Sequence, residues 1–476
     1  MPDQHLAVRR YARIAPLLIA FLALFAAFSL RNLEPLTFPT IFAEDGSWFE
    51  KIARDGPFAA SLTVRPGFPV LGLTLLQSAA ILAIDVFFSG DIFYLPAAYF
   101  VVSNAFLAGL ALFMFCVLRR FLSAAASLGA VIATVLMPVG LDGNEIFGRI
   151  LNLVFLFPPL TFLLLVDMSR SRRSWAALLP ITAVLLVCLM TLPVALLVVV
   201  SWLALALTLQ ILPRKAITPT TSWMADRPYG WRLIGIVIVC VAIAAVLLPP
   251  DVLTDSGGAK APIAFSAMIE FALARTVLYP FVAAFYDRLS DATTVALTAL
   301  YAAVCIFALV RQIRLGGLSD KALLLVFAAM CLGCQVVALV IFRPGLTSLF
   351  DHYRSTFPDR YFYGANITSV LVLAIALDSL AASRARMLFG GAAALLVACG
   401  VIAHAKTIIE LSRPATTWRD QGDIVQTTCA FARGALPTNP GANAAPVAIP
   451  IYPPAWSIVV SRDRYELFLR RHCAAT

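Results

Sequence analysis

Long runs of apolar residues recur along this chain of 476 residues, from the first at 14–30 to the last at 387–403. A helix that crosses a bilayer needs about 20 largely apolar residues, because the hydrocarbon core is about 30 Å thick. Hydrophobic residues make up 61% of the sequence and charged residues only 13%, which is not the composition of a water-soluble domain. The runs are continuous rather than alternating, which excludes a lipid-facing β-barrel. The chain is therefore predicted to be an all-α polytopic membrane protein.

The positions of Lys and Arg predict how the chain crosses the membrane, since basic residues accumulate in short cytoplasmic loops. Basic clusters precede the first run and follow several later ones, as far as Arg384 and Arg386. With every cluster inside, the chain has about 11 transmembrane helices (range 10–13), a cytoplasmic N-terminus and an external C-terminus. The net charge of +10 is then a topology signal rather than a nucleic-acid footprint. The predicted spans are 14–30, 92–118, 122–140, 150–167, 175–191, 193–211, 233–250, 292–310, 322–342, 362–380 and 387–403.

Two further apolar stretches, 68–88 and 263–286, do not fit as crossings, because either one alone would move the next basic cluster to the wrong side. We expect both to lie against the outer membrane surface or to dip into it. Glu270 and Arg275 in the second stretch favour an interfacial helix over a buried span. For the first stretch, an ordinary transmembrane helix is an equal alternative.

Residues 1–404 are predicted to form the transmembrane domain, with a first external loop at 31–67, and 405–476 a small external tail. The tail contains a helical segment followed by the strand-like "APVAIPIYPPAWSIVV", and is too small for a separate enzyme. Cys429 and Cys473 lie in this tail, where an oxidising compartment permits a disulfide. Most of the other cysteines lie in apolar runs, where a thiol behaves as a small apolar side chain.

The stretch "FAEDGSWFEKIARDG" in the first external loop places two carboxylates, Glu44 and Asp45, side by side. Phe49 and Ile52 have helical spacing, which predicts an amphipathic helix on the outer leaflet. Two roles fit the acidic pair. Acidic residues are favoured at the start of a helix by its unpaired N–H groups and its dipole. Alternatively, one carboxylate is a general base whose pKa is raised by its neighbour.

The first apolar helix, the acidic pair that opens an interfacial helix and the following "RPGFPVLGLTLLQ" together resemble the first external loop of GT-C glycosyltransferases. This family includes the lipid A aminoarabinose transferases and the protein O-mannosyltransferases. Its loop carries a catalytic acid, an aromatic residue four positions later and then a basic-Pro step, which Asp45, Phe49 and Arg65 with Pro66 match here. The chain is also similar to bacterial GT-C-like proteins with an "EDG" loop, through Arg360-Tyr361 and "IPIYPPAWSIVV". The acidic pair has the reverse of the usual Asp-Glu order.

The resemblance implies transfer of a sugar from a polyprenyl-phosphate carrier to an acceptor hydroxyl of a cell-envelope glycan or glycolipid, outside the cytoplasmic membrane of a bacterium. A phosphate leaves without a general acid, so one base suffices for an inverting displacement. Asp45 is the expected base and Glu44 its supporting neighbour. The leaving phosphate needs a cation, and the fork of an arginine matches phosphate oxygens. The expected donor-phosphate residues are Arg360, Tyr361, Arg65 and Arg343, and the secondary acceptor-site residues are Glu145, His352 and Arg275.

The expected partners are membrane lipid, the polyprenyl-phosphate sugar and the glycan or glycolipid acceptor, with no nucleic acid. No cofactor is expected, and a divalent metal is left open. A membrane transporter or lipid-linked sugar flippase is the competing class, which predicts charges near the bilayer midplane and broken helices in repeated halves. Asp85, Asp167 and Asp378 fall near the ends of apolar runs, which favours transfer over transport. A non-catalytic assembly or polymer-ligating membrane protein is the third alternative.

Overall fold

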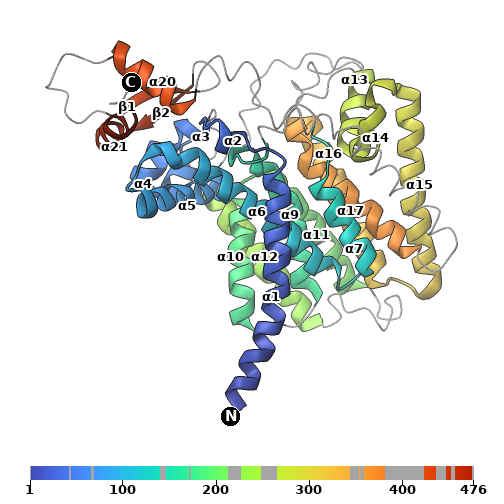
Figure 1. Ribbon diagram of the computed structural model, residues 1–476. Helices are drawn as coiled ribbons and strands as arrows, with labels where there is room; N and C mark the ends of the chain where they lie inside the picture. Colours follow the sequence, from blue (N-terminus) through green and yellow to red (C-terminus); the bar gives the residue numbers. More distant parts are fainter. Residues whose placement is uncertain are drawn as a thin grey trace. The chain divides into compact units, whose positions relative to one another are not determined.

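The computed structural model describes residues 2–41, 44–65, 69–139, 146–170, 173–212, 227–247, 265–342, 353, 359–380, 423–435, 446–451 and 456–473. Most of these residues are helical (Figure 1). The chain divides into two compact units. The first unit comprises Met1–Gly109, Gly143–Val154 and Ile408–Thr476, and the second comprises Leu110–Asp142 and Phe155–Thr407. The C-terminal tail thus groups with the N-terminal part of the chain.

The first unit joins apolar helices to short loop helices and a small sheet. Its N-terminal elements are α1 (Pro2–Ser29), α2 (Glu34–Thr37), α3 (Glu44–Ser47), α4 (Phe49–Ser61), α5 (Leu71–Phe88), η1 (Ile92–Tyr94) and the first part of α6 (Leu95–Leu118). Its C-terminal elements are α20 (Ile424–Ala435), β1 (Val447–Ile451), β2 (Trp456–Val460), α21 (Arg462–Phe468) and η10 (Leu469–Cys473). The two strands pair antiparallel, with Ile449 opposite Ile458, which confirms the strands expected in the tail.

The second unit is a helical bundle. Serine side chains begin three of its helices: Ser123, Ser174 and Ser290 each accept a hydrogen bond from a backbone N–H of the first turn that follows. Its elements are α7 (Ala124–Val135), α9 (Phe157–Arg170), α10 (Trp175–Leu189), α11 (Val194–Ile211), α12 (Arg227–Leu247), α13 (Phe265–Ile269), η6 (Glu270–Leu278), α14 (Tyr279–Val282), η7 (Ala283–Arg288), α15 (Asp291–Gly316), α16 (Asp320–Phe342), η9 (Asp359–Tyr361) and α17 (Tyr363–Ser379), while η3 (Leu151–Leu156) spans the boundary between the units.

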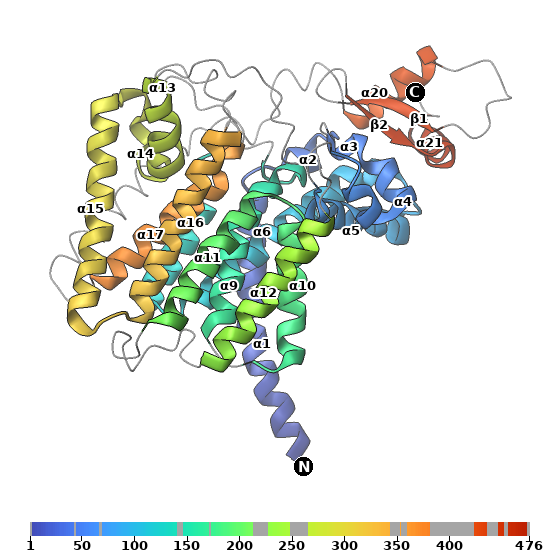
Figure 2. The same ribbon diagram turned by 180° about the vertical axis from the view of Figure 1, so that it is seen from behind.

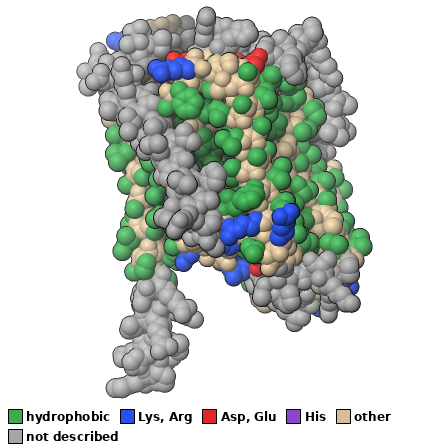
Figure 3. Space-filling model, turned by 90° about the vertical axis from the view of Figure 1, so that its right-hand side faces the viewer, with side chains coloured by type: hydrophobic (Ala, Val, Ile, Leu, Met, Phe, Trp, Pro, Cys, Tyr) green, Lys and Arg blue, Asp and Glu red, His purple; other side chains and the backbone are tan. Residues whose placement is uncertain are grey.

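Eight helices among the described residues are long and apolar enough to cross a membrane, and four shorter helices are also apolar. On the face shown in Figure 3, hydrophobic side chains cover the middle, and charged side chains lie toward the upper and lower borders. Every predicted span as far as 362–380 overlaps one of these helices, whereas 387–403 lies outside the described residues. These are the helices of a multi-pass membrane protein, and the number of about 11 crossings stays a prediction.

The two stretches that did not fit as crossings are also helical, and both meet the length and composition of a span. In Figures 1 and 2, α5 lies beside α4 and runs across the direction of α1. Its place on the membrane surface or across the membrane stays a prediction. The segment from α13 to η7 differs from expectation. Glu270 and Arg275 are buried inside the second unit, at 2% and 0% exposure, whereas the sequence favoured an interfacial helix.

Carboxylates at the ends of apolar helices in the second unit are paired with basic residues. Asp167 on α9 accepts hydrogen bonds from Arg120 and Arg173, which belong to two of the predicted cytoplasmic clusters. Asp378 on α17 lies 2.6 Å from the Lys321 Nζ and accepts a hydrogen bond from the Ser123 hydroxyl. These contacts connect the ends of neighbouring helices, which fits the interpretation that both carboxylates lie near the membrane boundary.

Candidate functional site

A buried ion pair anchors the loop at 31–67, which the sequence predicts to be external. The Arg149 NH2 lies 2.6 Å from the Glu34 Oε2, and both side chains are at most 1% exposed. Thr40 completes the cluster: its hydroxyl donates to Glu34 over 2.8 Å, and its carbonyl oxygen accepts from Arg149. Burial raises the pKa of the Glu34 carboxyl, and the nearby Arg149 guanidinium opposes that shift. This cluster fixes the chain directly before the acidic motif.

The acidic pair opens a short helix, as the sequence predicted. Glu44 is the first residue of α3, and its side chain lies outside what the structure describes. Asp45 is fully buried. Its Oδ1 accepts a hydrogen bond of 2.7 Å from the Gln77 Nε2 on α5, and its backbone carbonyl accepts one of 3.0 Å from the Tyr99 hydroxyl on α6. Asp45 therefore connects the loop to two apolar helices.

Gly46 allows α3 to pack directly against the tail hairpin. A Cβ atom at this position would lie 3.0 Å from the Ile41 side chain and 3.3 Å from the Cβ of Ile458, and closer still to Ile451. Real Cβ atoms rarely approach other atoms so closely, because side chains at such distances overlap. At the glycine of the "EDG" motif, any larger residue would therefore force the isoleucines of the hairpin and Ile41 to shift.

The helix that follows the acidic motif lines a cavity of about 540 Å³. This volume is typical of a small-molecule site. Its walls carry two cations, two indoles and two hydroxyls from α3, α4, the turn after α4 and β2; the lining residues are Ser47, Trp48, Lys51, Thr63, Val64, Arg65 and Trp456. The Lys51 Nζ donates to the Thr63 carbonyl oxygen over 3.2 Å, which holds the ammonium group at the turn. A cavity with this lining suits an anionic ligand that also has an apolar face.

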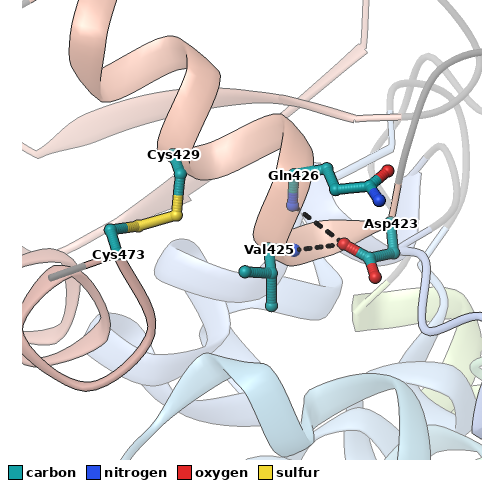
Figure 4. Close-up of a disulfide and its surroundings, with 5 residues drawn as sticks. All are labelled: Asp423, Val425, Gln426, Cys429 and Cys473. Carbon is teal, nitrogen blue, oxygen red and sulfur yellow. Dashed lines mark hydrogen bonds between the residues drawn. A yellow bond between two sulfur atoms is a disulfide. The ribbon is translucent and has the colours of Figure 1, made fainter. Parts of the chain in front are cut away.

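The tail is held by contacts within itself and by contacts with the rest of the first unit. Cys429 on α20 and Cys473 in η10 form a disulfide with a Cα–Cα distance of 5.6 Å, as expected (Figure 4). Asp423 begins α20 by accepting hydrogen bonds from two backbone N–H groups (Figure 4). At the far end, the buried carboxylate of Asp91 accepts from Arg471 over 3.2 Å and lies 2.9 Å from the His472 Nε2.

Of the predicted donor-phosphate residues, Arg65 lines the cavity. Asp45 belongs to the same unit as Arg65 but is not among the residues that line the cavity. Arg360 and Tyr361 belong to the second unit, in η9, where the Arg360 guanidinium lies 5.1 Å from the centre of the Tyr361 ring. The Tyr361 ring packs edge-on against Phe155 at 5.0 Å. Arg343, Glu145 and His352 lie outside the described residues.

The secondary candidate Arg275 is fully buried in η6 of the second unit. Its guanidinium lies over the rings of Tyr279, at 3.8 Å, and Tyr286, at 5.2 Å. The nearby Glu270 accepts a hydrogen bond of 2.7 Å from the Tyr286 hydroxyl. Aromatic faces attract a guanidinium, so this cage stabilises a cation inside an apolar helical unit. In this arrangement Arg275 is enclosed by the protein's own side chains.

Comparisons with protein-family models, curated proteins and solved structures found no match. The cavity and the acidic motif are therefore the features of the chain that indicate a function. Sequence reasoning missed Trp48, Lys51 and Gln77 as members of this region, although their residue types suit a binding site. In the described part of the chain, no group of three or more His, Cys, Asp and Glu side chains is placed to hold a metal ion.

Proposed function

We propose that this chain is a membrane glycosyltransferase of the GT-C type. It moves a sugar from a polyprenyl-phosphate carrier to an acceptor hydroxyl of a cell-envelope glycan or glycolipid on the outer face of a bacterial cytoplasmic membrane. The observation that carries the proposal is the cavity with Lys51 and Arg65, directly after the acidic motif on the same loop. Two cations in a partly enclosed cavity attract phosphate, and indole faces suit a sugar ring.

The proposed reaction needs one base and one phosphate site. Lys51 and Arg65 bind the phosphate of the donor and stabilise the negative charge that grows on it as the sugar leaves. Asp45 accepts the proton of the acceptor hydroxyl, supported by Glu44. The family resemblance alone predicts further phosphate contacts from Arg360, Tyr361 and Arg343.

The burial of Asp45 allows a contrasting role. A carboxylate with no exposed surface, held by Gln77, is also what a purely structural residue at the start of α3 would look like. As the base, Asp45 must meet the acceptor hydroxyl, which requires local opening where α3 packs against the hairpin. The two roles predict different outcomes when the basicity of the carboxylate is removed without changing its shape.

The test of the proposed function is product formation by the purified full-length protein. It is reconstituted in liposomes with a radiolabelled polyprenyl-phosphate sugar and a membrane-lipid extract as the source of acceptor. We expect the label to move to a new, carrier-free product in the presence of the protein. Recovery of all label on the original carrier, with several donor sugars and acceptor extracts, would contradict a transferase.

The second candidate, movement of lipid-linked sugar across the bilayer, is favoured by one observation in the second unit. Glu270 and Arg275 are buried in a segment, Ala267–Arg288, that has the length and apolarity of a span. Buried charges in such segments often mark transport pathways. The same liposomes distinguish this candidate, because a flippase changes the leaflet in which the labelled lipid resides and leaves the sugar on its carrier.

A further inference from the structure

Trp456 reaches the cavity because of the alternation of β2. Side chains of a strand point to opposite faces in turn, so Trp456, Ile458 and Val460 share one face. Ile458 and Val460 are fully buried, and the hairpin packs against α3 at Gly46. The shared face is therefore the one that meets the loop helices. Trp456, at its end, remains partly exposed and lines the cavity.

Trp456 differs from the other lining residues in its origin. The remaining residues of the cavity come from positions 47–65 of the first external loop, whereas Trp456 comes from the tail, nearly 400 residues later in the chain. The loop supplies both cations, Lys51 and Arg65. Trp48 is only 4% exposed, so most of its ring is covered by the protein. Of the two tryptophans that line the cavity, Trp456 is therefore the more accessible to a ligand.

We infer that Trp456 is a specificity-determining residue that stacks on the sugar ring of a phosphorylated sugar, while Lys51 and Arg65 bind the phosphate. This assignment rests on the proposed function, which supplies the class of ligand. The C–H face of a pyranose ring packs on an indole, and the cations fix the end that carries the charge. The indole therefore discriminates between sugars, and the cations discriminate between charged and neutral ligands.

The position of Trp456 is maintained by the fastening of the tail. The disulfide between Cys429 and Cys473 joins α20 to η10, and α20 packs against β1, the partner of β2. The backbone N–H of Ile424 also donates to the Pro39 carbonyl oxygen over 2.9 Å, which ties α20 to the loop before the acidic motif. Trp456 is thus carried on a hairpin that packs against a helix tied to both η10 and the loop before the acidic motif.

Binding measured by calorimetry on the purified full-length protein tests the assignment. The probes are glucose, mannose and N-acetylglucosamine 1-phosphates, inorganic phosphate, and the neutral methyl glucoside. The wild-type protein is expected to bind at least one sugar phosphate more tightly than inorganic phosphate. Trp456→Ala should weaken binding of that sugar phosphate by about tenfold and leave binding of inorganic phosphate unchanged. Trp456→Phe should restore part of the lost affinity. Lys51→Ala should weaken the binding of both the sugar phosphate and inorganic phosphate.

The matched control is Trp175→Ala on α10, because Trp175 is 65% exposed and does not line the cavity. Its sugar-phosphate affinity should equal that of the wild type. Repeating the titration with a polyprenyl-phosphate sugar identifies the source of the ligand: tighter binding than the free sugar phosphate indicates the lipid-linked form, and equal binding indicates a soluble one. Either result is compatible with the role of Trp456.

Two results would overturn the inference. One is an unchanged sugar-phosphate affinity in Trp456→Ala, and the other is no binding of any probe to the wild-type protein. The proposed function fails separately. Binding that depends on Trp456, together with no sugar transfer in liposomes, would retain the binding site and reject the transferase. Transfer with an unaltered donor preference in Trp456→Ala would retain the transferase and reject the role of Trp456.

Discussion

The Gln77 side chain holds the carboxylate of Asp45: its Nε2 donates a hydrogen bond of 2.7 Å to the Asp45 Oδ1, and both residues are fully buried. Removing the hydrogen-bond donor of a buried carboxylate costs folding free energy, because no water molecule replaces the lost bond. This contact joins the loop that carries the acidic motif to α5. Through this bond α5 holds the carboxylate of the proposed base, while Tyr99 on α6 holds its backbone carbonyl.

Gln77→Leu should therefore lower the free energy of unfolding by about 1–3 kcal/mol. The double variant Gln77→Leu with Asp45→Leu should recover part of the loss, since removing both partners of a buried hydrogen bond costs less than removing one. Thermal unfolding of the purified protein in detergent, followed by circular dichroism, measures both. Equal melting temperatures of Gln77→Leu and the wild type would show that the bond contributes nothing.

Gly46→Ala should destabilise the packing of α3 against the hairpin. The new methyl group would overlap Ile451 and press on Ile41 and Ile458, and such overpacking costs about 1–3 kcal/mol. Gly434→Ala on α20 is the matched control, because a Cβ there meets no atom within 4 Å. Limited proteolysis of the tail should be faster in the first variant and unchanged or slower in the second. A protected tail in Gly46→Ala would contradict the close approach.

Removing the disulfide should loosen the tail without unfolding the membrane helices. Cys429 and Cys473 are 44 residues apart, and cross-links of this kind contribute about 2–4 kcal/mol. Cys473→Ser should increase proteolysis of the tail, whereas Cys305→Ser, at a free cysteine of α15, should not. In cells treated with a thiol-alkylating reagent before lysis, neither tail cysteine of the wild type should be labelled. Full labelling of both would place the tail in a reducing compartment.

Arg149→Met should destabilise the protein more at pH 8 than at pH 5. Burial already raises the pKa of Glu34 above its ordinary value of 4.5, and loss of Arg149 removes the group that lowers it. A carboxyl whose pKa is raised by folding stabilises the protein at pH values below its unfolded-state pKa. This stabilisation is lost as the pH rises from about 4.5 through the raised pKa of the folded state. At pH 8 the ionised Glu34 would be buried without its partner, at a cost of about 3–5 kcal/mol.

Arg54→Met is the control for this pH dependence, because Arg54 pairs with Asp55 on the surface. An exposed ion pair contributes little, so the change in melting temperature should be small. Melting curves of both variants at pH 5 and pH 8 make the comparison. A destabilisation by Arg149→Met that is the same at both pH values would mean that Glu34 does not respond to its partner.

Local sequence patterns predicted the helices well, because each apolar run satisfies its backbone hydrogen bonds internally and needs no distant partner. Local sequence also predicted the acidic start of α3 and the strands of the tail. Contacts between distant segments were not predictable. Asp45 bonds to residues 32 and 54 positions away, and nothing in the spacing of Gln77 or Tyr99 indicates this. Trp456 was noted only within the tail motif, since its cavity neighbours lie in another part of the sequence.

The burial of Arg275 shows a second limit. A charged residue in an apolar stretch usually indicates an interface with water, and on that basis the segment was expected at the membrane surface. The structure instead surrounds the guanidinium with Tyr279, Tyr286 and Phe362, which lie on different elements. Such a cage depends on tertiary packing, so the sequence alone indicates an exposed charge where the fold provides a buried one.

Sugar transfer by the acidic motif requires a basic carboxylate at position 45, so the turnover of Asp45→Asn decides the role of the motif. The amide keeps the shape of the side chain, and its oxygen can still accept the hydrogen bond from Gln77. The assay uses the purified protein, its polyprenyl-phosphate sugar and the acceptor, with donor binding measured in parallel. We expect turnover to fall by about 100-fold or more with donor binding retained, and a milder loss in Glu44→Gln. Near-normal turnover in Asp45→Asn would contradict this expectation: an inactive Glu44→Gln would then make Glu44 the base, and full activity in both would reduce the pair to a helix start.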